Sequence, residues 1–260
     1  MDSTKNGFTI NLAGTVSVVI GSSEGIGAAI AVGLAKAGSS VVCGGRDRER
    51  MAATIAAIAG AGGCGEAEIV DVREKESVGA FAAAVLARHE AATILVNSMG
   101  GTLIKPMAEV EVGEWDNLHQ THLRGTLLTC QAFFGAMRAG GYGKIINLSS
   151  LAGTRVSPRR GSYSVAKAGL DQLTRALAAE WGRYGIRVNA IAPSTTRTPR
   201  ASAQLLREPQ READIVSRTP LGRLARPEDM VGPALFLASP LSDFVTGQTL
   251  AVDGGMLSSR

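Results

Sequence analysis

The chain has 260 residues, of which 45% are hydrophobic and 19% charged, and this balance excludes a disordered polar chain. Its net charge is +4, only 4% of its residues are aromatic, and no run of five like charges occurs, so nothing indicates a nucleic-acid-binding surface. Glycine is in excess, at 32 residues against a usual share of ~7%. No Gly-X-Y period accompanies it, which excludes collagen. The glycines are therefore expected at separate positions where the local backbone conformation requires them.

The cysteines and the first residues bear on the compartment. Cys43, Cys64 and Cys130 are odd in number and widely spaced, which predicts a reducing environment without disulfides or a thiolate metal site. Residues 1–11 lack a basic segment followed by an apolar one, so no signal peptide is predicted. The longest uncharged run, residues 6–23, is broken by polar residues and glycine and could not span a bilayer. We expect a cytoplasmic protein.

Short apolar runs alternate with helical patterns along the chain. The expected strands are Val16–Ile20, Ser40–Gly44, Ala67–Val70, Ile94–Asn97, Lys144–Leu148, Ile186–Ile191 and Thr249–Val252. The expected helices are Ile26–Ala37, Arg48–Ala59, Lys75–His89, Glu111–Met137, Ser162–Tyr184 and Pro227–Leu237. This alternation predicts one α/β domain over residues 1–260, with a doubly wound seven-stranded parallel sheet and helices on both faces. Residues 194–226 do not follow this alternation of strands and helices. They are expected to form an excursion above the sheet that acts as a substrate loop.

A glycine-rich turn follows the first expected strand. Gly21 allows the tight turn, Gly25 lets backbone amides approach a phosphate, and Gly27 permits close packing of helix on strand. The free N–H groups of the following helix then suit a pyrophosphate. This context predicts a Rossmann-fold dinucleotide site, although a merely compact turn is the alternative. The residues expected to contact the cofactor here are Gly21, Ser23, Glu24, Gly25, Ile26 and Gly27.

Tyr163 and Lys167 are spaced to lie on one face of a helix, one turn apart. An ammonium beside a phenol favours the phenolate, so we expect the pKa of Tyr163 to fall from its usual ~10 toward the range of a general acid/base. Ser150 lies 13 residues earlier, at the end of an expected strand, and could hydrogen-bond a substrate carbonyl. A Tyr-x-x-x-Lys pair alone is usually structural, but beside the glycine-rich turn it predicts a catalytic centre.

With these motifs the chain resembles the short-chain dehydrogenase/reductase family from Val16 to Gly255. The resemblance implies that Tyr163 exchanges a proton with the carbinol oxygen and that Ser150 polarises the carbonyl. It implies that Lys167 lowers the pKa of Tyr163 and binds the nicotinamide ribose. It also implies cofactor contacts from Asp71, Val72, Asn97, Gly100, Pro193, Thr196 and Thr198. The chain departs from the family's usual residues at Ile20, Ser98, Met99 and Ser194.

His122 is the departure of most consequence, because the family usually has Asn there, supporting a water that leads protons to the lysine. Imidazole also donates and accepts, and it titrates near neutral pH. We therefore expect His122 to be either a member of a proton relay or a buried structural residue. His89 and His119 are typical helix residues, and no spacing among the three histidines predicts a metal site.

The end of the second expected strand bears on the choice of cofactor. Gly45 stands where an NAD site places a carboxylate, and Arg46 offers a fork for a 2′-phosphate. Glu24 is evidence against NADP, because similar proteins that use NADP often carry Arg or Lys at that position. We expect NADP(H), with NAD(H) possible.

Basic residues gather in the three segments that line the substrate pocket in similar proteins. They are Lys105, Arg155, Arg159, Arg160, Arg197, Arg200 and Arg207, with no acid between them within each segment. We expect an anionic substrate, a sugar acid or similar hydroxy or keto acid, held by Arg155 and Arg160. Solvated or subunit-contact arginines are the equally weighted alternative.

The sequence thus predicts an NAD(P)-dependent oxidoreductase that interconverts a secondary alcohol and a ketone. The subfamilies it resembles most are gluconate 5-dehydrogenases, through residues 218–223, and 3-oxoacyl-carrier-protein reductases. Gly141 and Tyr184 stand where the latter are basic, yet a 3-oxoacyl thioester or secondary-metabolite ketoreductase is the alternative. A catalytically silent nucleotide-binding sensor or partner subunit is an alternative of another class. The resemblance further implies a homotetramer, with no nucleic acid or membrane as partner.

Overall fold

The computed structural model describes residues 10–89, 91–206 and 209–258, and its centre is one sheet of seven strands. The strands are β1 (Val16–Ile20), β2 (Ser40–Gly45), β3 (Gly65–Ile69), β4 (Ile94–Asn97), β5 (Gly143–Leu148), β6 (Ile186–Pro193) and β7 (Thr249–Val252). They run in the order β3-β2-β1-β4-β5-β6-β7, with every neighbouring pair parallel. The predicted fold class is confirmed. The order reverses between β1 and β4, and in such sheets ligands bind at this switch point, beyond the carboxyl ends of the strands.

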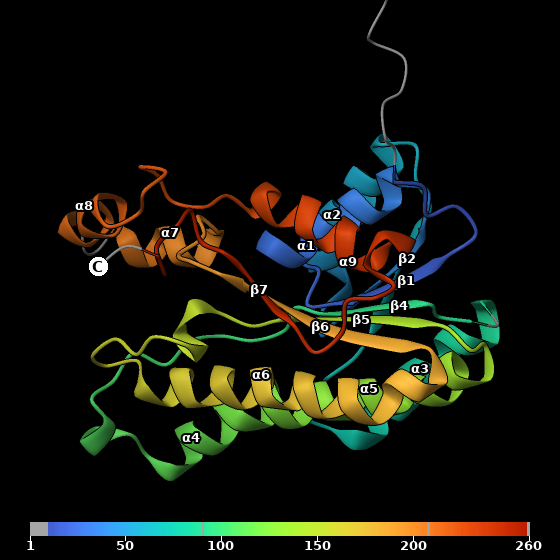
Figure 1. Cartoon of the computed structure of the whole chain (residues 1–260), viewed down its shortest axis with the longest axis horizontal. Helices are drawn as coiled ribbons and strands as arrows, with labels where there is room; N and C mark the ends of the chain where they lie inside the picture. Colours follow the sequence, from blue (N-terminus) through green and yellow to red (C-terminus); the bar gives the residue numbers. More distant parts are fainter. Residues whose placement is uncertain (1–9, 90, 207–208, 259–260) are drawn as a thin grey trace, which may run out of the picture.

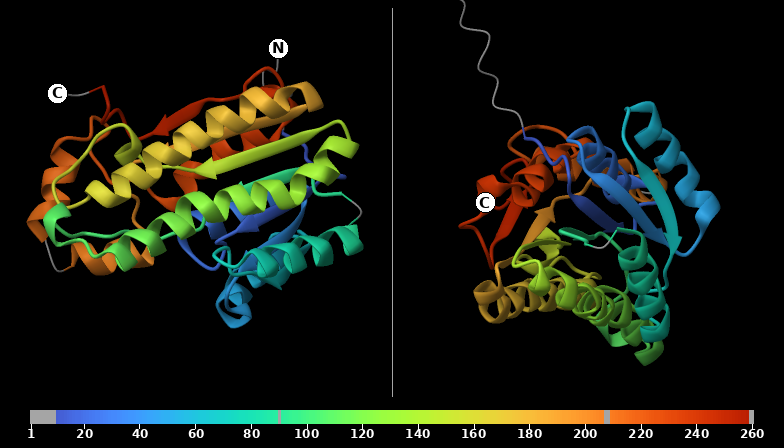
Figure 2. Two further views of the ribbon diagram at one scale, coloured as in Figure 1. Left: turned by 90° about the horizontal axis from the view of Figure 1, so that it is seen from below. Right: turned by 90° about the vertical axis from the view of Figure 1, so that its right-hand side faces the viewer.

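Helices cover both faces of the sheet, as Figures 1 and 2 show. One face carries α1 (Gly25–Lys36), α2 (Arg48–Gly60) and α9 (Val231–Ala238), and the other carries α3 (Lys75–His89), α5 (Gly125–Ala139) and α6 (Gly161–Trp181). Successive side chains of a strand point to opposite faces. In β1, Val18 therefore joins the core with Phe133, and Val19 joins the other core with Ile30. Burial on both faces explains why the strands read as continuous apolar runs.

The β3 strand begins two residues earlier than predicted. Gly65 and Glu66 lie outside the predicted strand, but both pair with β2. Glu66 and Glu68 lie at this edge of the sheet, and Arg88 of α3 donates to each of them, at 3.0 and 2.8 Å. An edge strand with such partners tolerates charged side chains that a central strand would not. Hydropathy alone could therefore not predict that the charged start of β3 belongs to the strand.

The long helix predicted over Glu111–Met137 is not continuous. It consists of α4 (Val112–His119), a π-helical turn over Gln120–Arg124, and α5. The turn ends where the backbone N–H of Gly125 donates to the carbonyl of Gln120, five residues back. Single π-helical turns are frequent at functional sites. This one holds His122 in the interior.

The excursion over residues 194–226 contains two helices that the sequence pattern did not predict, α7 (Pro199–Leu205) and α8 (Pro209–Ser217). Leu205 of α7 and Ile215 of α8 pack together with Leu224 of the following loop, and Met256 lies beside them. Figure 1 shows them beyond one end of the sheet, where they overhang the carboxyl ends of the strands. Short 3-10 turns occupy Met107–Glu109, Leu151–Gly153, Gly182–Tyr184, Pro227–Met230 and Pro240–Ser242.

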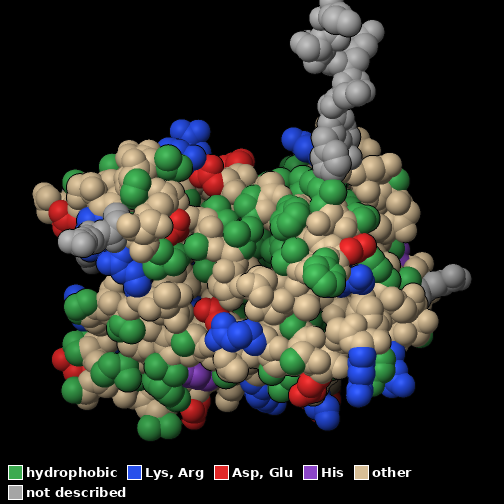
Figure 3. Space-filling model, in the orientation of Figure 1, with side chains coloured by type: hydrophobic (Ala, Val, Ile, Leu, Met, Phe, Trp, Pro, Cys, Tyr) green, Lys and Arg blue, Asp and Glu red, His purple; other side chains and the backbone are tan. Residues whose placement is uncertain are grey.

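Hydrophobic side chains stay exposed beside the edge strand β7. Phe244 is fully exposed, and Leu241 and Leu250 are 47% and 39% exposed. Figure 3 shows hydrophobic side chains gathered near the middle of this face, over α9 and the loop that precedes β7. No helix among the described residues is both long and apolar enough to cross a bilayer. The homotetramer stays a prediction.

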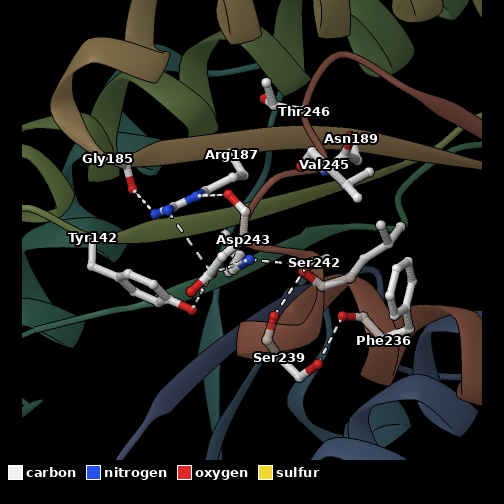
Figure 4. Close-up of polar contacts among 12 residues, drawn as sticks. Tyr142, Gly185, Arg187, Asn189, Phe236, Ser239, Ser242, Asp243, Val245 and Thr246 are labelled. Carbon is white, nitrogen blue, oxygen red and sulfur yellow. Dashed lines mark hydrogen bonds and ion pairs between the residues drawn. The ribbon is translucent and has the colours of Figure 1, made fainter.

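A polar network around Asp243 fastens the loop before β7 to the sheet (Figure 4). Lys144 of β5 is fully buried, and its Nζ lies 2.9 Å from the Ser242 hydroxyl and 2.8 Å from Asp243 Oδ1. The Tyr142 hydroxyl also donates to Asp243, and Arg187 Nε donates to its carbonyl oxygen. Burial lowers the pKa of Lys144, and the Asp243 carboxylate acts in the opposite direction by stabilising the charged amine.

Asp243→Ala should destabilise the protein more than Lys144→Met, because the first leaves a buried cation without its carboxylate and the second removes the cation. We expect Asp243→Ala to lower the free energy of unfolding by about 2 kcal/mol, measured by urea denaturation. The double variant should be no less stable than Lys144→Met, because the ion pair is already absent. Equal stability of Asp243→Ala and wild type would contradict this account of the network.

Candidate active site

A cleft of about 1250 Å³ lies over the carboxyl ends of β1, β4, β5 and β6. All but one of the residues predicted for catalysis, cofactor or substrate line it. The exception is Asn97, whose side chain is buried within the sheet, donating to Asn147 at 2.9 Å and accepting from Thr129 at 2.8 Å. The Asn97 side chain therefore holds β4 against β5 and α5 and does not line the cleft, and its predicted contact with the cofactor stays a prediction.

The glycine-rich turn at the switch point brings three backbone segments into contact. A Cβ on Gly21, whose φ is +84°, would lie 2.7 Å from the carbonyl carbon of Ser98. A Cβ on Gly27 would lie 2.2 Å from the carbonyl oxygen of Gly21. Only glycine fits these two positions. Glu24, the N-cap of α1, makes no side-chain cap, so the first amides of the helix are left for an anion. The turn therefore fits the diphosphate of a dinucleotide.

The three predicted catalytic side chains meet at the opposite wall of the cleft. Ser150 caps the 3-10 turn after β5, and its hydroxyl accepts from the amide of Ala152 at 3.2 Å. Tyr163 lies in the first turn of α6, and its phenol is hydrogen-bonded to Ser150. Lys167 follows one turn later, with Nζ 5.7 Å from the centre of the tyrosine ring.

The expected lowering of the Tyr163 pKa is wrong for the protein alone. Burial raises the pKa of Tyr163, although Ser150 and Arg160 act in the opposite direction. Lys167 contributes little because its Nζ donates to the carbonyl of Leu148, at 2.5 Å, and does not reach the phenol. Burial lowers the pKa of Lys167 itself to about 8. Spacing at i and i+4 places the two side chains on one face but does not fix where the amine points.

His122 is 3% exposed and braces the loop that follows β4. Its Nε2 lies 2.8 Å from the carbonyl oxygen and 3.1 Å from the amide nitrogen of Gly101, and its ring meets Tyr163 edge-on at 5.6 Å. A Cβ on Gly100 would lie 1.9 Å from His122 Cε1, so the imidazole also dictates glycine there. Burial and the nearby Lys167 lower the pKa of His122 to about 3. A ring that stays neutral favours the buried structural role over a relay that must take up protons.

Three carboxylates line the cleft, those of Glu24, Asp47 and Asp71. They lie beside the glycine-rich turn and the residues that follow β2 and β3, a region called the adenosine end because Arg46, the predicted 2′-phosphate residue, belongs to it. Two of the three carboxylates already accept at least two hydrogen bonds each. Asp47 caps α2 by accepting from the amides of Glu49 and Arg50. Asp71 is held by Arg73 Nε and Nη2, at 3.0 and 2.6 Å, and this guanidinium lowers the pKa of Asp71 to about 2. The Asp71 side chain, predicted to contact the cofactor, is thus already paired with Arg73, while Asp71 and Val72 still line the cleft.

The other end of the cleft contains Arg155 and Arg160, which were predicted to hold the substrate, and we call it the substrate end. It is basic and has no carboxylate among its lining residues. Its arginines are Arg155, Arg159, Arg160, Arg200, Arg211 and Arg218. Arg155 donates to the carbonyl of Met256, and Arg200, from α7, donates to that of Gly100. Two of the residues expected to be unopposed do have acidic partners, since Lys105 pairs with Glu114 and Arg197 with Glu212. Arg207 lies outside the described residues.

Comparisons with known proteins agree with this geometry. Residues 20–257 match a family model described as enoyl-(acyl carrier protein) reductase. The chain is 32% identical to gluconate 5-dehydrogenase of Gluconobacter oxydans strain 621H, covering 96% of this chain and 97% of the relative. It is 35% identical to 2-dehydro-3-deoxy-D-gluconate 5-dehydrogenase of Escherichia coli strain K12, covering 95% and 97%.

The chain belongs to the short-chain dehydrogenase/reductase family. A crystal structure of a gluconate 5-dehydrogenase from Burkholderia cenocepacia J2315, in complex with NADP and tartrate, matches it with a TM-score of 0.92 and 35% identity. The match covers 96% of this chain and 98% of that one. With these relatives the chain is an oxidoreductase of the gluconate 5-dehydrogenase-like type, and NADP(H) is a cofactor of this group.

Four arginines of this short-chain dehydrogenase/reductase site were missed by sequence reasoning. They are Arg50, Arg73, Arg211 and Arg218, all of which line the cleft. Arg50 lies in the first turn of α2, four residues after Arg46, and this nearness along the chain could have indicated it. Arg211 and Arg218 come from α8 and the residue after it, where no sequence pattern sets the direction of the side chains.

His122→Gln should reduce the loss of stability in acid. The folded-state pKa of about 3 lies below the ordinary 6.5, so the unfolded chain takes up this proton first as the pH falls. Wild type should then lose about 2 kcal/mol more unfolding free energy than His122→Gln between pH 7 and pH 4.5. Urea denaturation at the two pH values measures this difference. The same loss in both proteins would show that His122 is not buried in its neutral form.

Proposed function

We propose that this chain interconverts a secondary alcohol and a ketone with NADP(H), and that its substrate is an anionic hydroxy or keto acid of the sugar-acid type. The observation that carries the proposal is that Ser150 and Tyr163 share one cleft with a glycine-only phosphate turn. The basic lining beside them supports the substrate class, and so do the names of the relatives.

Proton transfer in this proposal belongs to Tyr163. NADP(H), when bound, supplies or accepts the hydride at the carbon. In reduction the Tyr163 hydroxyl gives its proton to the carbonyl oxygen, and in oxidation the phenolate takes it back, while Ser150 donates a hydrogen bond to the same oxygen. Burial raises the pKa of Tyr163, which keeps the phenol protonated at neutral pH and suits the direction of reduction.

Lys167 completes the proposed centre from behind Tyr163. Burial lowers the pKa of Lys167 to about 8. Its Nζ lies 5.7 Å from the centre of the Tyr163 ring, and we propose that it binds the nicotinamide ribose. His122, uncharged near neutral pH, would position Gly101 and the Tyr163 ring.

An anionic substrate follows from the charge of the far end of the cleft. Arg155 is exposed at the mouth, and Arg160 lies close enough to lower the pKa of Tyr163. A guanidinium fork holds a carboxylate through two parallel hydrogen bonds. The Burkholderia relative was crystallised with tartrate, a dicarboxylate. We propose that Arg155 and Arg160 hold the carboxylate of the substrate.

Tyr163→Phe should abolish most turnover while leaving NADPH binding intact. Loss of a general acid typically costs a factor on the order of 10²–10⁴ in rate. Single-turnover oxidation of NADPH with a keto acid measures the rate, and fluorescence of the bound nucleotide measures affinity. Unchanged turnover would refute the role of Tyr163. A wild-type protein that binds NADPH but oxidises it with no carbonyl compound would support the silent sensor instead.

Arg155→Ala and Arg160→Ala should each weaken the use of an anionic substrate and spare a neutral one. We expect KM for gluconate to rise roughly tenfold or more, with a change below about twofold for the neutral polyol glucitol. Arg175→Ala is the matched control, because Arg175 is an exposed arginine of α6 outside the cleft. If both substrates respond alike, the anionic substrate is wrong and the arginines are only structural.

A further inference from the structure

Glu24 occupies the N-cap of α1 without capping it. The carboxylate makes no hydrogen bond to the helix amides and instead lies beside α2, with Oε2 3.4 Å from Arg50 Nη2. A carboxylate at the helix N-terminus would be attracted to the same partial positive charge as a diphosphate. The pairing with Arg50 thus keeps the turn open for the cofactor.

Arg50 is loosely held and lines the adenosine end of the cleft. Its side chain is 57% exposed, and the contact with Glu24 is its one ion pair among the described residues. Exposed pairs of this kind contribute little to stability. A phosphate dianion offers more charge and three acceptor oxygens, so it should displace a single carboxylate from the guanidinium.

The surrounding groups favour a phosphate over a free ribose hydroxyl. Gly45 offers no carboxylate, and those of Asp47 and Asp71 are already bonded to α2 amides and to Arg73. Arg46 makes no hydrogen bond or ion pair within the described part of the chain, and it acts on Asp71 only through its charge. The region therefore has two available guanidinium groups, one without a hydrogen-bonded partner and one weakly paired. Glu24, whose exposed contact with Arg50 is that weak pair, is the carboxylate that competes with a phosphate.

We infer that Arg50 is a second cation for the 2′-phosphate of NADP(H), beside Arg46, and that Glu24 is an internal competitor for it. Without the phosphate, Glu24 occupies Arg50. With it, the guanidinium exchanges one anion for the other, and the carboxylate is left near a dianion. Arg50 thus raises the preference for NADP(H) over NAD(H), and Glu24 limits it. The inference rests on the proposed cofactor and names the pair that sets its selectivity.

Calorimetric titration of wild type, Arg50→Ala and Glu24→Gln with NADPH and with NADH tests the exchange without relying on turnover. Arg50→Ala should weaken NADPH binding roughly tenfold and change NADH binding less than about twofold. Glu24→Gln should tighten NADPH binding roughly threefold, again with little effect on NADH. Adenosine 2′,5′-bisphosphate should reproduce both changes, and adenosine 5′-monophosphate neither.

Arg48→Ala is the matched control, because Arg48 is an exposed arginine of the same helix that does not line the cleft. If Arg50→Ala binds NADPH as Arg48→Ala does, Arg50 does not contact the phosphate. If Glu24→Gln weakens NADPH binding, Glu24 orients Arg50 and does not compete for it. Either result overturns this inference while leaving the proposed function intact. A wild-type protein that binds neither nucleotide overturns both.

Discussion

The carboxyl end of β1 meets α1 and the end of β4 so closely that only backbone fits between them. This contact depends on two glycines, since a methyl group on Gly27 would collide with the carbonyl of Gly21, and one on Gly21 with Ser98. The close approach lets α1 begin directly above the sheet with its amides facing the cleft. The remaining groups of the site are arranged around the anion that these amides would bind.

Charge divides the cleft into two ends with different chemistry. At the adenosine end, acids and arginines occur together, and most of the acids are already bonded to neighbouring amides or guanidinium groups. At the other end six arginines line the wall without a carboxylate. Tyr163 lies beside this second end, so the proposed substrate anion would bind close to its hydroxyl. The net charge of +4 is therefore unevenly distributed.

Much of the fold could be predicted because strands buried on both faces of a sheet appear in the sequence as continuous apolar runs. All seven strands were predicted, and β3 differed because its start is charged and glycine-containing. The glycine-rich turn and the positions of Ser150, Tyr163 and Lys167 follow from short-range spacing. Residue spacing could not predict the π-helical turn that buries His122. That turn depends on which backbone carbonyl accepts the hydrogen bond from the Gly125 amide, and the acceptor is Gln120.

The direction of long side chains was also beyond the sequence. Lys167 donates to the carbonyl of Leu148 and does not approach the phenol of Tyr163. We expected Lys167 to lower the pKa of Tyr163, but burial raises it. Lys105 and Arg197 point to acids that lie 9 and 15 residues away along the chain. Such pairings are settled by tertiary contacts, and a local pattern of charges does not specify them.

A crystal structure with NADP and a sugar acid tests the central claim most directly, because that claim is about where each group binds. The account predicts the diphosphate on the amides that open α1, the 2′-phosphate between Arg46 and Arg50, and the reacting oxygen against Ser150 and Tyr163. A nucleotide bound with its diphosphate away from the Gly21–Gly27 turn, or a substrate oxygen out of reach of Tyr163, would contradict it.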